Sequence, residues 1–278
     1  MEIVLLGTGS PIPDPNRAGP ATLLKVGELE HVLVDAGRGC IMRMAGAGSI
    51  PGFLAGVLVT HLHSDHVTDL NDVITTHWIM SQAPTPLRIW GPAGIADFVR
   101  HTMAALAPDI GYRIAHHEDL TWEPIVEVIE LEPGDRFEVG TSTVSVHRTA
   151  HEPVEPSIGY RFEHGNYVVA LAGDTTPCAG VDEMCVGADA YVQTVLRDDL
   201  VKQIPNQRFN DILDYHSSVI DAARTAARNR VGRLVLTHMV PAPAPEHYPE
   251  WIAIAAEHFD GEIIIGDDLT TIDLIEGD

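Results

Sequence analysis

The sequence predicts an α/β fold, and three observations support this prediction. Apolar, strand-like runs alternate with helical segments through the first half of the 278-residue chain, as in layered α/β proteins. Further strands, separated by turn residues, fill the second half. The run Thr60–His66 (THLHSDH) directly follows the buried-type segment Leu54–Val59, and α/β proteins usually place their sites at the ends of such strands.

The first half reads as short strands, one loop and three helices. The Pro- and Gly-rich segment Ser10–Pro20 predicts a loop. Helical patterns cover Gly39–Ala47, Val67–Met80 and Ala93–Ala107. The expected strands are Glu2–Leu6, Ala21–Val26, His31–Asp35, Gly56–Thr60 and Leu87–Trp90.

The second half is richer in strands and contains one long predicted helix, Ser217–Arg230, whose alanines give it high helix propensity. The candidate site residues are spread along most of the chain, so they must converge in one fold, and we expect a single domain over residues 1–278. The expected strands are Glu127–Leu131, Arg136–Val139, Thr143–Arg148, Ile158–Glu163, Tyr167–Ala172, Asp189–Thr194, Arg233–Thr237, Glu262–Ile265 and Thr270–Leu274.

The histidine-rich run has the composition of a metal site. His61 and His63 lie two residues apart in an extended segment, so their side chains project from the same side of the chain. Asp65 and His66 follow at a turn and can reach a second position nearby. Zinc favours imidazole nitrogen, with carboxylate oxygen as a further ligand. The run therefore predicts ligands for two adjacent metal ions.

This H-x-H-x-D-H run resembles the signature of the metallo-β-lactamase superfamily, and five further segments resemble its ribonuclease Z (tRNase Z) branch. The resemblance implies an αββα four-layer sandwich, in which two sheets pack face to face with helices outside. The five segments, in matching order and spacing, are Leu5–Pro11, Val34–Gly37, Leu171–Thr175, Tyr215–Ser218 and Leu236–Met239.

The resemblance also implies a centre of two zinc ions, for which Mn²⁺ or Fe²⁺ could substitute. Asp65 is in addition a candidate catalytic residue that orients the nucleophile, and Asp35 is a candidate support behind a ligating histidine. The implied ligands are His61, His63 and His151 for the first ion, Asp65, His66 and His238 for the second, and Asp174 as the bridge.

His216 is the second candidate catalytic residue. In the ribonuclease Z branch, a histidine in a similar motif helps protonate the leaving oxygen and is supported by a glutamate on an earlier strand. Here Gln193 stands where the resemblance places that glutamate. A glutamine can hydrogen-bond an imidazole but cannot stabilise its charged form, which leaves proton donation by His216 open.

The charge balance bears on the substrate. The chain has 17 basic and 40 acidic residues and a net charge of −23, which repels phosphate backbones and disfavours a large nucleic acid without excluding it. The ribonuclease Z branch carries a basic arm that grips tRNA. The corresponding stretch here, Arg100–Glu132, is rich in carboxylates and holds one arginine, Arg113, between its ends.

We therefore expect a zinc-dependent hydrolase whose metal-bound hydroxide attacks a small ester: a phosphodiester, sulfate ester, carboxylic ester or lactone. A tRNA 3′-end endonuclease and a non-catalytic metal-binding protein are the alternatives. The loop expected over Arg197–Tyr215, with Phe209 and Tyr215, is placed to cover the site, as is Trp78, and these side chains could form an apolar wall for the substrate.

Composition limits location and partners. No apolar run approaches the roughly 20 residues that span a bilayer, and no signal-peptide pattern begins the sequence. Cys40, Cys178 and Cys185 are odd in number and do not suggest a disulfide framework. We expect a cytoplasmic protein with no membrane partner. The oligomeric state stays open, with a homodimer among the options.

Overall fold

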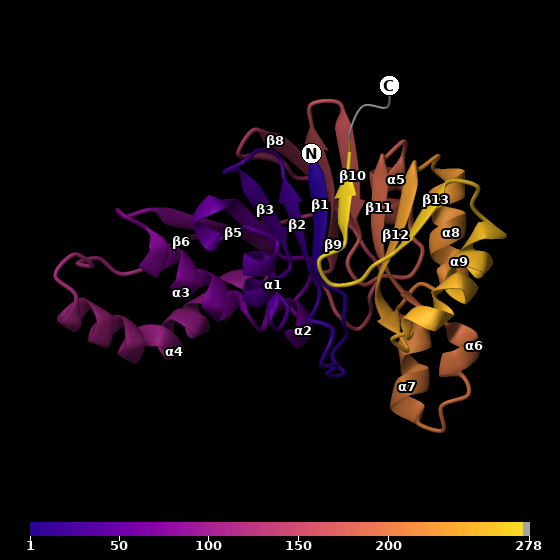
Figure 1. Ribbon diagram of the computed structural model, residues 1–278, viewed down its shortest axis with the longest axis horizontal. Helices are drawn as coiled ribbons and strands as arrows, with labels where there is room; N and C mark the ends of the chain where they lie inside the picture. The colour runs from indigo at the N-terminus through magenta and orange to yellow at the C-terminus, as the bar shows by residue number, and fades with distance from the viewer. Residues whose placement is uncertain (275–278) are drawn as a thin grey trace.

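The computed structural model describes residues 1–274 and contains two seven-stranded sheets with helices on their outer faces (Figure 1). The first sheet has the order β14-β1-β2-β3-β4-β5-β6, and the second has the order β13-β12-β11-β10-β9-β8-β7. In each sheet, antiparallel pairs at one end give way to parallel pairs at the other, from β3 to β6 and from β10 to β13. This arrangement confirms the predicted αββα sandwich.

The strands are β1 (Glu2–Gly7), β2 (Ala21–Lys25), β3 (His31–Val34), β4 (Leu54–Leu58), β5 (Pro86–Pro92), β6 (Ile125–Leu131), β7 (Arg136–Val139), β8 (Ser142–Arg148), β9 (Ile158–His164), β10 (Tyr167–Leu171), β11 (Ala190–Leu196), β12 (Arg233–Val240), β13 (Glu262–Ile265) and β14 (Thr271–Asp273). The α-helices are α1 (Cys40–Gly46), α2 (Ser64–Val67), α3 (Leu70–Met80), α4 (Ile95–His116), α5 (Ala179–Cys185), α6 (Asp198–Val201), α7 (Gln207–Asp211), α8 (Val219–Arg228) and α9 (Tyr248–Ala256). Short 3₁₀ turns are η1 (Pro51–Phe53), η2 (Ile212–Asp214) and η3 (Pro245–His247).

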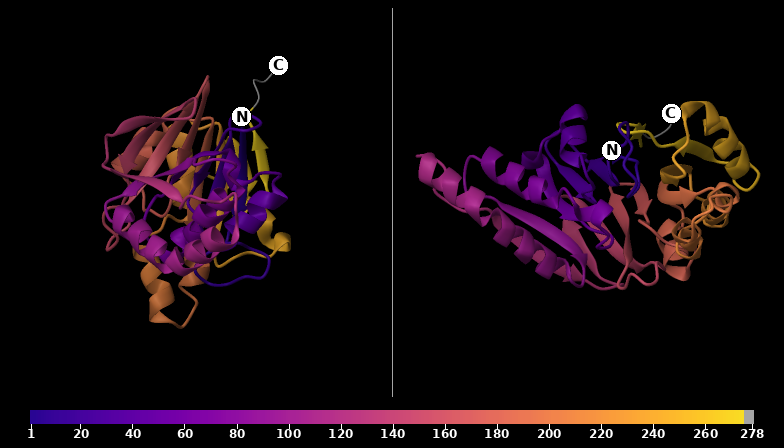
Figure 2. Two further views of the ribbon diagram at one scale, coloured as in Figure 1. Left: turned by 90° about the vertical axis from the view of Figure 1, so that its left-hand side faces the viewer. Right: turned by 90° about the horizontal axis from the view of Figure 1, so that it is seen from below.

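Three layers of buried apolar side chains separate the four layers of the sandwich. The middle layer lies between the two sheets and includes Tyr160 and Phe162. A second layer joins the first sheet to α1, α3 and α4, and a third joins the second sheet to α5, α8 and α9. Viewed from below, the helices of the two halves lie on opposite sides of the sheets (Figure 2). Central strands are therefore buried on both faces, as in β11, where every residue is buried.

Two predicted helices differ from the structure. The prediction of one helix over Val67–Met80 is wrong, because the Asp69 N–H donates to the Ala36 carbonyl (2.9 Å) and the chain divides there into α2 and α3. The predicted helix Ala93–Ala107 continues as α4 to His116, with Pro108 inside it. Its outer half is held by Ile110, which packs beside Trp78 and Leu120. Within residues 1–274, no helix combines the length and apolar character needed to cross a bilayer.

Arg17 fastens the loop between β1 and β2 to the C-terminal part of the chain. Its guanidinium donates to Thr8 Oγ1 (2.6 Å), the Gly266 carbonyl (3.0 Å), the Tyr248 hydroxyl (2.7 Å) and Asp267 Oδ1 (2.8 Å). The Arg17 side chain is only 6% exposed. Removing it takes this donor away from two buried acceptors, the Thr8 hydroxyl and the Gly266 carbonyl.

We expect Arg17→Ala to lower the free energy of unfolding by about 3 kcal/mol, since hydrogen bonds to charged groups and newly unsatisfied partners each cost on this scale. The urea midpoint measures the change. The matched control is Arg38→Ala, because Arg38 is exposed and substitutions at such surface positions usually change stability by less than about 0.5 kcal/mol. Equal midpoints for the two variants would contradict the role given to Arg17.

Candidate metal centre

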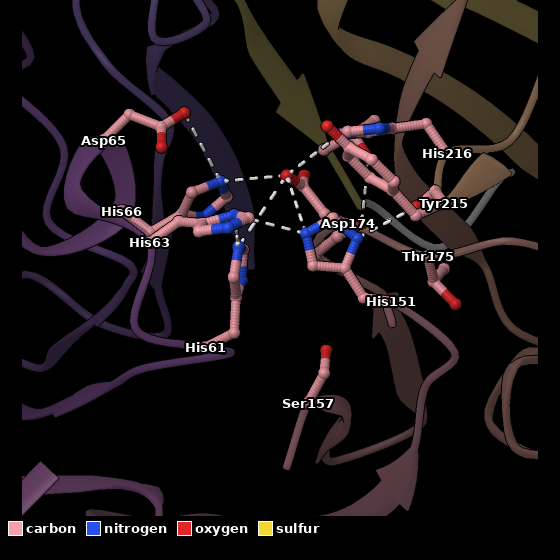
Figure 3. Close-up of polar contacts among 12 residues, drawn as sticks. His61, His63, Asp65, His66, His151, Ser157, Asp174, Thr175, Tyr215 and His216 are labelled. Atoms are coloured by element: carbon pink, nitrogen blue, oxygen red, sulfur yellow. Dashed lines mark hydrogen bonds and ion pairs between the residues drawn. The ribbon is translucent and has the colours of Figure 1, made fainter. Parts of the chain in front are cut away.

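The seven predicted ligands lie in two neighbouring groups, and Figure 3 labels all of them except His238. They form two groups, and within each group the candidate ligand atoms lie within 4.8 Å of one another. The first group is His61, His63, His151 and Asp174, and the second is Asp65, His66 and His238. Residues distant in the sequence are thus brought together as the resemblance implied.

The first group has the spacing of a tetrahedral ligand set. His63 Nδ1 lies 3.1 Å from His61 Nε2 and 3.2 Å from His151 Nε2. Asp174 Oδ2 lies 3.7 Å from His61 Nε2 and 3.8 Å from His151 Nε2. Ligand atoms bound about 2.0–2.1 Å from a tetrahedral zinc stand about 3.3–3.4 Å apart. The residues present therefore fit an ion at this position.

The second group shares Asp174 with the first. Asp174 Oδ2 lies 3.5 Å from His66 Nε2 and 3.8 Å from His238 Nε2. Asp65 Oδ2 lies 3.2 Å from His238 Nε2 and 3.8 Å from His66 Nε2. Among the described residues, His66 Nε2 and Asp174 Oδ1 are buried polar atoms without a hydrogen-bond partner. Such atoms are costly unless something binds them, which also fits a cation.

Two backbone features aim these side chains. Gly173 adopts a positive φ of 63° immediately before Asp174, and a Cβ there would lie 2.8 Å from Thr60 Oγ1. His238 has a φ of 47°, and the pairing register with β11 shifts at this point. The predicted strand end at Thr237 is therefore wrong, since β12 continues through Val240 with a bulge. Bulges commonly redirect a side chain beside a site.

Asp35 lies behind His66. His66 Nδ1 donates to Asp35 Oδ2 (2.8 Å), and the Thr60 N–H donates to Asp35 Oδ1 (2.8 Å). The bond to Asp35 places the proton on Nδ1 and leaves the lone pair of His66 Nε2 for a metal. The candidate role of Asp35 as a support rather than a simple turn residue therefore has a geometric basis.

We expect Asp35→Asn to weaken metal affinity about 10- to 100-fold, the usual consequence of losing a carboxylate behind a ligating histidine. A neutral amide neither stabilises positive charge on His66 nor fixes its tautomer. Competition with a chelating dye measures the affinity, and Asp260→Asn, at an exposed acid away from the site, is the control. Unchanged affinity in Asp35→Asn would show that Asp35 serves only the backbone turn.

The histidines of the site differ in the direction in which their pKa is shifted. Burial lowers the pKa of His61, which favours its neutral form. Burial, the largest single effect, acts to lower the pKa of His66 and His238, but neighbouring carboxylates together raise both: Asp174 and Asp35 for His66, and Asp174 and Asp65 for His238. Burial alone would raise the pKa of Asp174, yet His238 and His66 hold it well below its usual value. Metal ions must displace protons from His66 and His238, so we expect metal affinity to fall as the pH decreases.

His216 lies beside the two groups. Its Nε2 is 3.2 Å from Asp174 Oδ2, and its Nδ1 donates to the Ile212 carbonyl at 3.1 Å. No hydrogen bond joins Gln193 to His216. The Gln193 side chain accepts from the Tyr191 hydroxyl and donates to the Thr194 carbonyl (2.7 Å), because it shares the face of β11 that packs against the helices. Gln193 stands where the resemblance places a supporting glutamate, but its hydrogen bonds go to Tyr191 and Thr194, so proton donation by His216 stays a prediction.

A cleft of about 380 Å³ opens from the metal groups. Phe209 and Tyr215 line it, as predicted, but the segment that carries them is not the predicted loop, because it folds into α6, α7 and η2. Ser10, Pro11 and Ile12 also line the cleft, and the sequence did not identify them as a wall. Trp78 is not at the site. It is buried in α3, where its Nε1 donates to the Trp122 carbonyl (2.9 Å).

Comparison with known proteins agrees with this geometry. The family model described as Beta-lactamase superfamily domain matches residues 30–239. Ribonuclease Z of Mycobacterium bovis (strain BCG / Pasteur 1173P2) is 51% identical over 276 residues, which cover 99% of this chain and 98% of that protein. Ribonuclease Z of Mycolicibacterium paratuberculosis (strain ATCC BAA-968 / K-10) is 52% identical, with coverages of 97% and 96%. The chain belongs to the ribonuclease Z branch of the metallo-β-lactamase superfamily.

Solved structures extend the agreement in fold. Human tRNase Z, short form, has a TM-score of 0.72 at 24% identity and covers 99% of this chain and 100% of its own. The metallo-beta-lactamase fold protein YhfI from Bacillus subtilis has a TM-score of 0.75 at 18% identity, with both chains covered to 98%. Membership of the ribonuclease Z branch places the chain among hydrolases whose His and Asp clusters suit divalent metal ions.

Proposed function

We propose that the protein is a zinc-dependent endoribonuclease that hydrolyses a phosphodiester bond at the 3′ end of precursor tRNA. The observation that carries this proposal is the identity of about half of all residues, over essentially the whole chain, with proteins named Ribonuclease Z. It favours the tRNA endonuclease alternative over the small-ester hydrolase that charge alone suggested. It also disfavours a non-catalytic protein.

Two zinc ions would be held by the two ligand groups, with Asp174 between them, because imidazole-rich sets of this kind suit zinc. When bound, the ions lower the pKa of a water and offset negative charge on the phosphate oxygens. Asp65, whose carboxylate lies beside His66 and His238, would orient the attacking water by accepting a hydrogen bond from it. His216, held through Nδ1 by the Ile212 carbonyl, presents Nε2 to the site and donates a proton to the leaving oxygen.

A tRNA substrate also supports a cytoplasmic location. A homodimer stays a prediction, which light scattering on the purified protein tests.

The test is a gel assay of zinc-loaded protein with a 3′-extended tRNA at physiological salt, beside bis(p-nitrophenyl) phosphate and nitrophenyl carboxylic and sulfate esters. We expect cleavage at a single position near the 3′ end, with added mature tRNA competing. Elemental analysis should show about two zinc ions per chain. Turnover of small esters without tRNA cleavage or competition would return the small-ester assignment, and turnover of neither would favour a binding protein.

A further inference from the structure

The cleft beside the metal groups has two walls that differ from its floor. Its floor consists of polar site residues, among them Asp174 and His216. One wall comes from residues 206–215, in the segment with α6 and α7 that projects from the body below the second sheet (Figure 1). The other comes from Ser10–Ile12 in the loop that Arg17 fastens. The cleft is therefore continuous with the candidate metal centre.

The walls offer apolar and aromatic surface to a ligand. Ile12 is 58% exposed, and Phe209 and Tyr215 are partly exposed. The Tyr215 ring stands edge-on to His151, with ring centroids 5.2 Å apart at 77°, so its orientation is fixed beside the metal groups (Figure 3). Exposed apolar surface next to a reactive centre commonly contacts the substrate.

Positive charge is scarce at this cleft. Most of the 17 basic side chains already pair with a carboxylate of the chain, as Arg17 does with Asp267 and Lys202 with Asp198. Arg208 differs, since within residues 1–274 its guanidinium makes no ion pair, and it lines the cleft. One free cation can neutralise one phosphate.

We propose that this cleft binds an unpaired nucleobase next to the scissile phosphate, by stacking on Phe209 and Tyr215, while Arg208 contacts one neighbouring phosphate. The proposal rests on the proposed ribonuclease function. It explains how a protein with a net charge of −23 can bind RNA. Aromatic stacking needs no net positive charge and accepts any base, since every base has a π face. Recognition then depends on an unpaired end of the RNA and little on its phosphate backbone.

Two measurable consequences follow. Losing one stacking platform should weaken binding about 5- to 150-fold. Binding to a single-stranded nucleic acid changes with salt by a log–log slope of about −0.7 for each neutralised phosphate. A site with Arg208 alone predicts a slope between about −0.5 and −1.5, far shallower than a basic arm would give.

The experiment measures fluorescence anisotropy of a labelled unpaired tetraadenylate with zinc-loaded protein carrying His216→Ala to slow cleavage. Phe209→Ala is introduced into this protein, beside Phe209→Tyr, which keeps the aromatic face. Tyr112→Ala removes an aromatic that is 75% exposed on α4 and does not line the cleft, and it serves as the control. A second probe has the same ribose-phosphate chain without bases.

We expect Phe209→Ala to weaken binding of the tetraadenylate at least 5-fold, Phe209→Tyr and Tyr112→Ala to leave it unchanged, and the baseless probe to bind equally to all. If Phe209→Ala weakened binding of both probes alike, Phe209 would have only a structural role and the proposal would be overturned. A salt slope steeper than about −3 would also overturn it. If the stacking pattern holds but the wild-type protein leaves 3′-extended tRNA intact, the ribonuclease assignment fails while the nucleobase site stands.

Discussion

Replacing Asp174 with alanine should reduce kcat/KM by more than about 10³-fold and lower the metal content of both groups. Asp174 Oδ2 approaches nitrogens of both groups, at 3.7 Å from His61 Nε2 and 3.5 Å from His66 Nε2. Stabilisation by bound metal contributes several kcal/mol to such reactions, and each 1.4 kcal/mol is tenfold in rate. Elemental analysis and steady-state kinetics on zinc-supplemented protein measure the two effects.

His63→Ala separates the two groups. His63 belongs to the first group alone, so this variant should lose about one ion per chain while Asp174→Ala loses both. Circular dichroism checks that each variant is folded, and Asp260→Ala is the surface control. An Asp174→Ala protein that retained two ions and full turnover would refute the ligand assignment as a whole.

Local spacing predicted some ligands and only resemblance predicted others. His61 and His63 share a side of an extended segment, and their nitrogens do lie 3.1 Å apart. His151 and His238 lie 88 and 175 positions beyond His63 in sequence, and no local pattern brings them together. Their convergence follows from the rim where strands of both sheets end, which is a property of the packed sandwich.

The residues that support the ligands and His216 were less predictable from the sequence than the ligands themselves. Val34-Asp35-Ala36 is compatible with a turn aspartate as well as with a support for His66, and the 2.8 Å bond to His66 Nδ1 decides between them. Gln193 occupies a strand buried on both faces, so sequence position could not say which face it takes. The Ile212 carbonyl, which holds His216, carries no sequence signal, since any residue has a carbonyl.

Net charge is a weaker guide to a substrate than the local surface of the site. It averages over the whole surface, and most cations here are already paired within the chain, as Arg43 is with Asp268. Whether RNA binds depends on the surface that meets it. In the proposed site, Phe209, Tyr215 and Arg208 supply that surface, and only the fold brings Ile12 to the same cleft.

His216→Ala should lower turnover about 10²- to 10⁴-fold, the usual contribution of a positioned acid, while leaving about two ions bound. His216 belongs to neither ligand group, yet its Nε2 lies 3.2 Å from Asp174 Oδ2. From this position Nε2 can donate a proton to the leaving oxygen of a bound substrate. A poor leaving group needs the proton and a nitrophenolate does not. The loss should therefore be large for 3′-extended tRNA and small for bis(p-nitrophenyl) phosphate.

His216→Gln is the matched variant, since its amide can donate a hydrogen bond but cannot transfer a proton. We expect it to resemble His216→Ala on tRNA, because what is lost is proton transfer and not packing against Tyr215. Elemental analysis accompanies both. Equal losses on the two substrates, or loss of zinc in either variant, would show that His216 supports the metal groups through Asp174 and does not protonate the leaving oxygen.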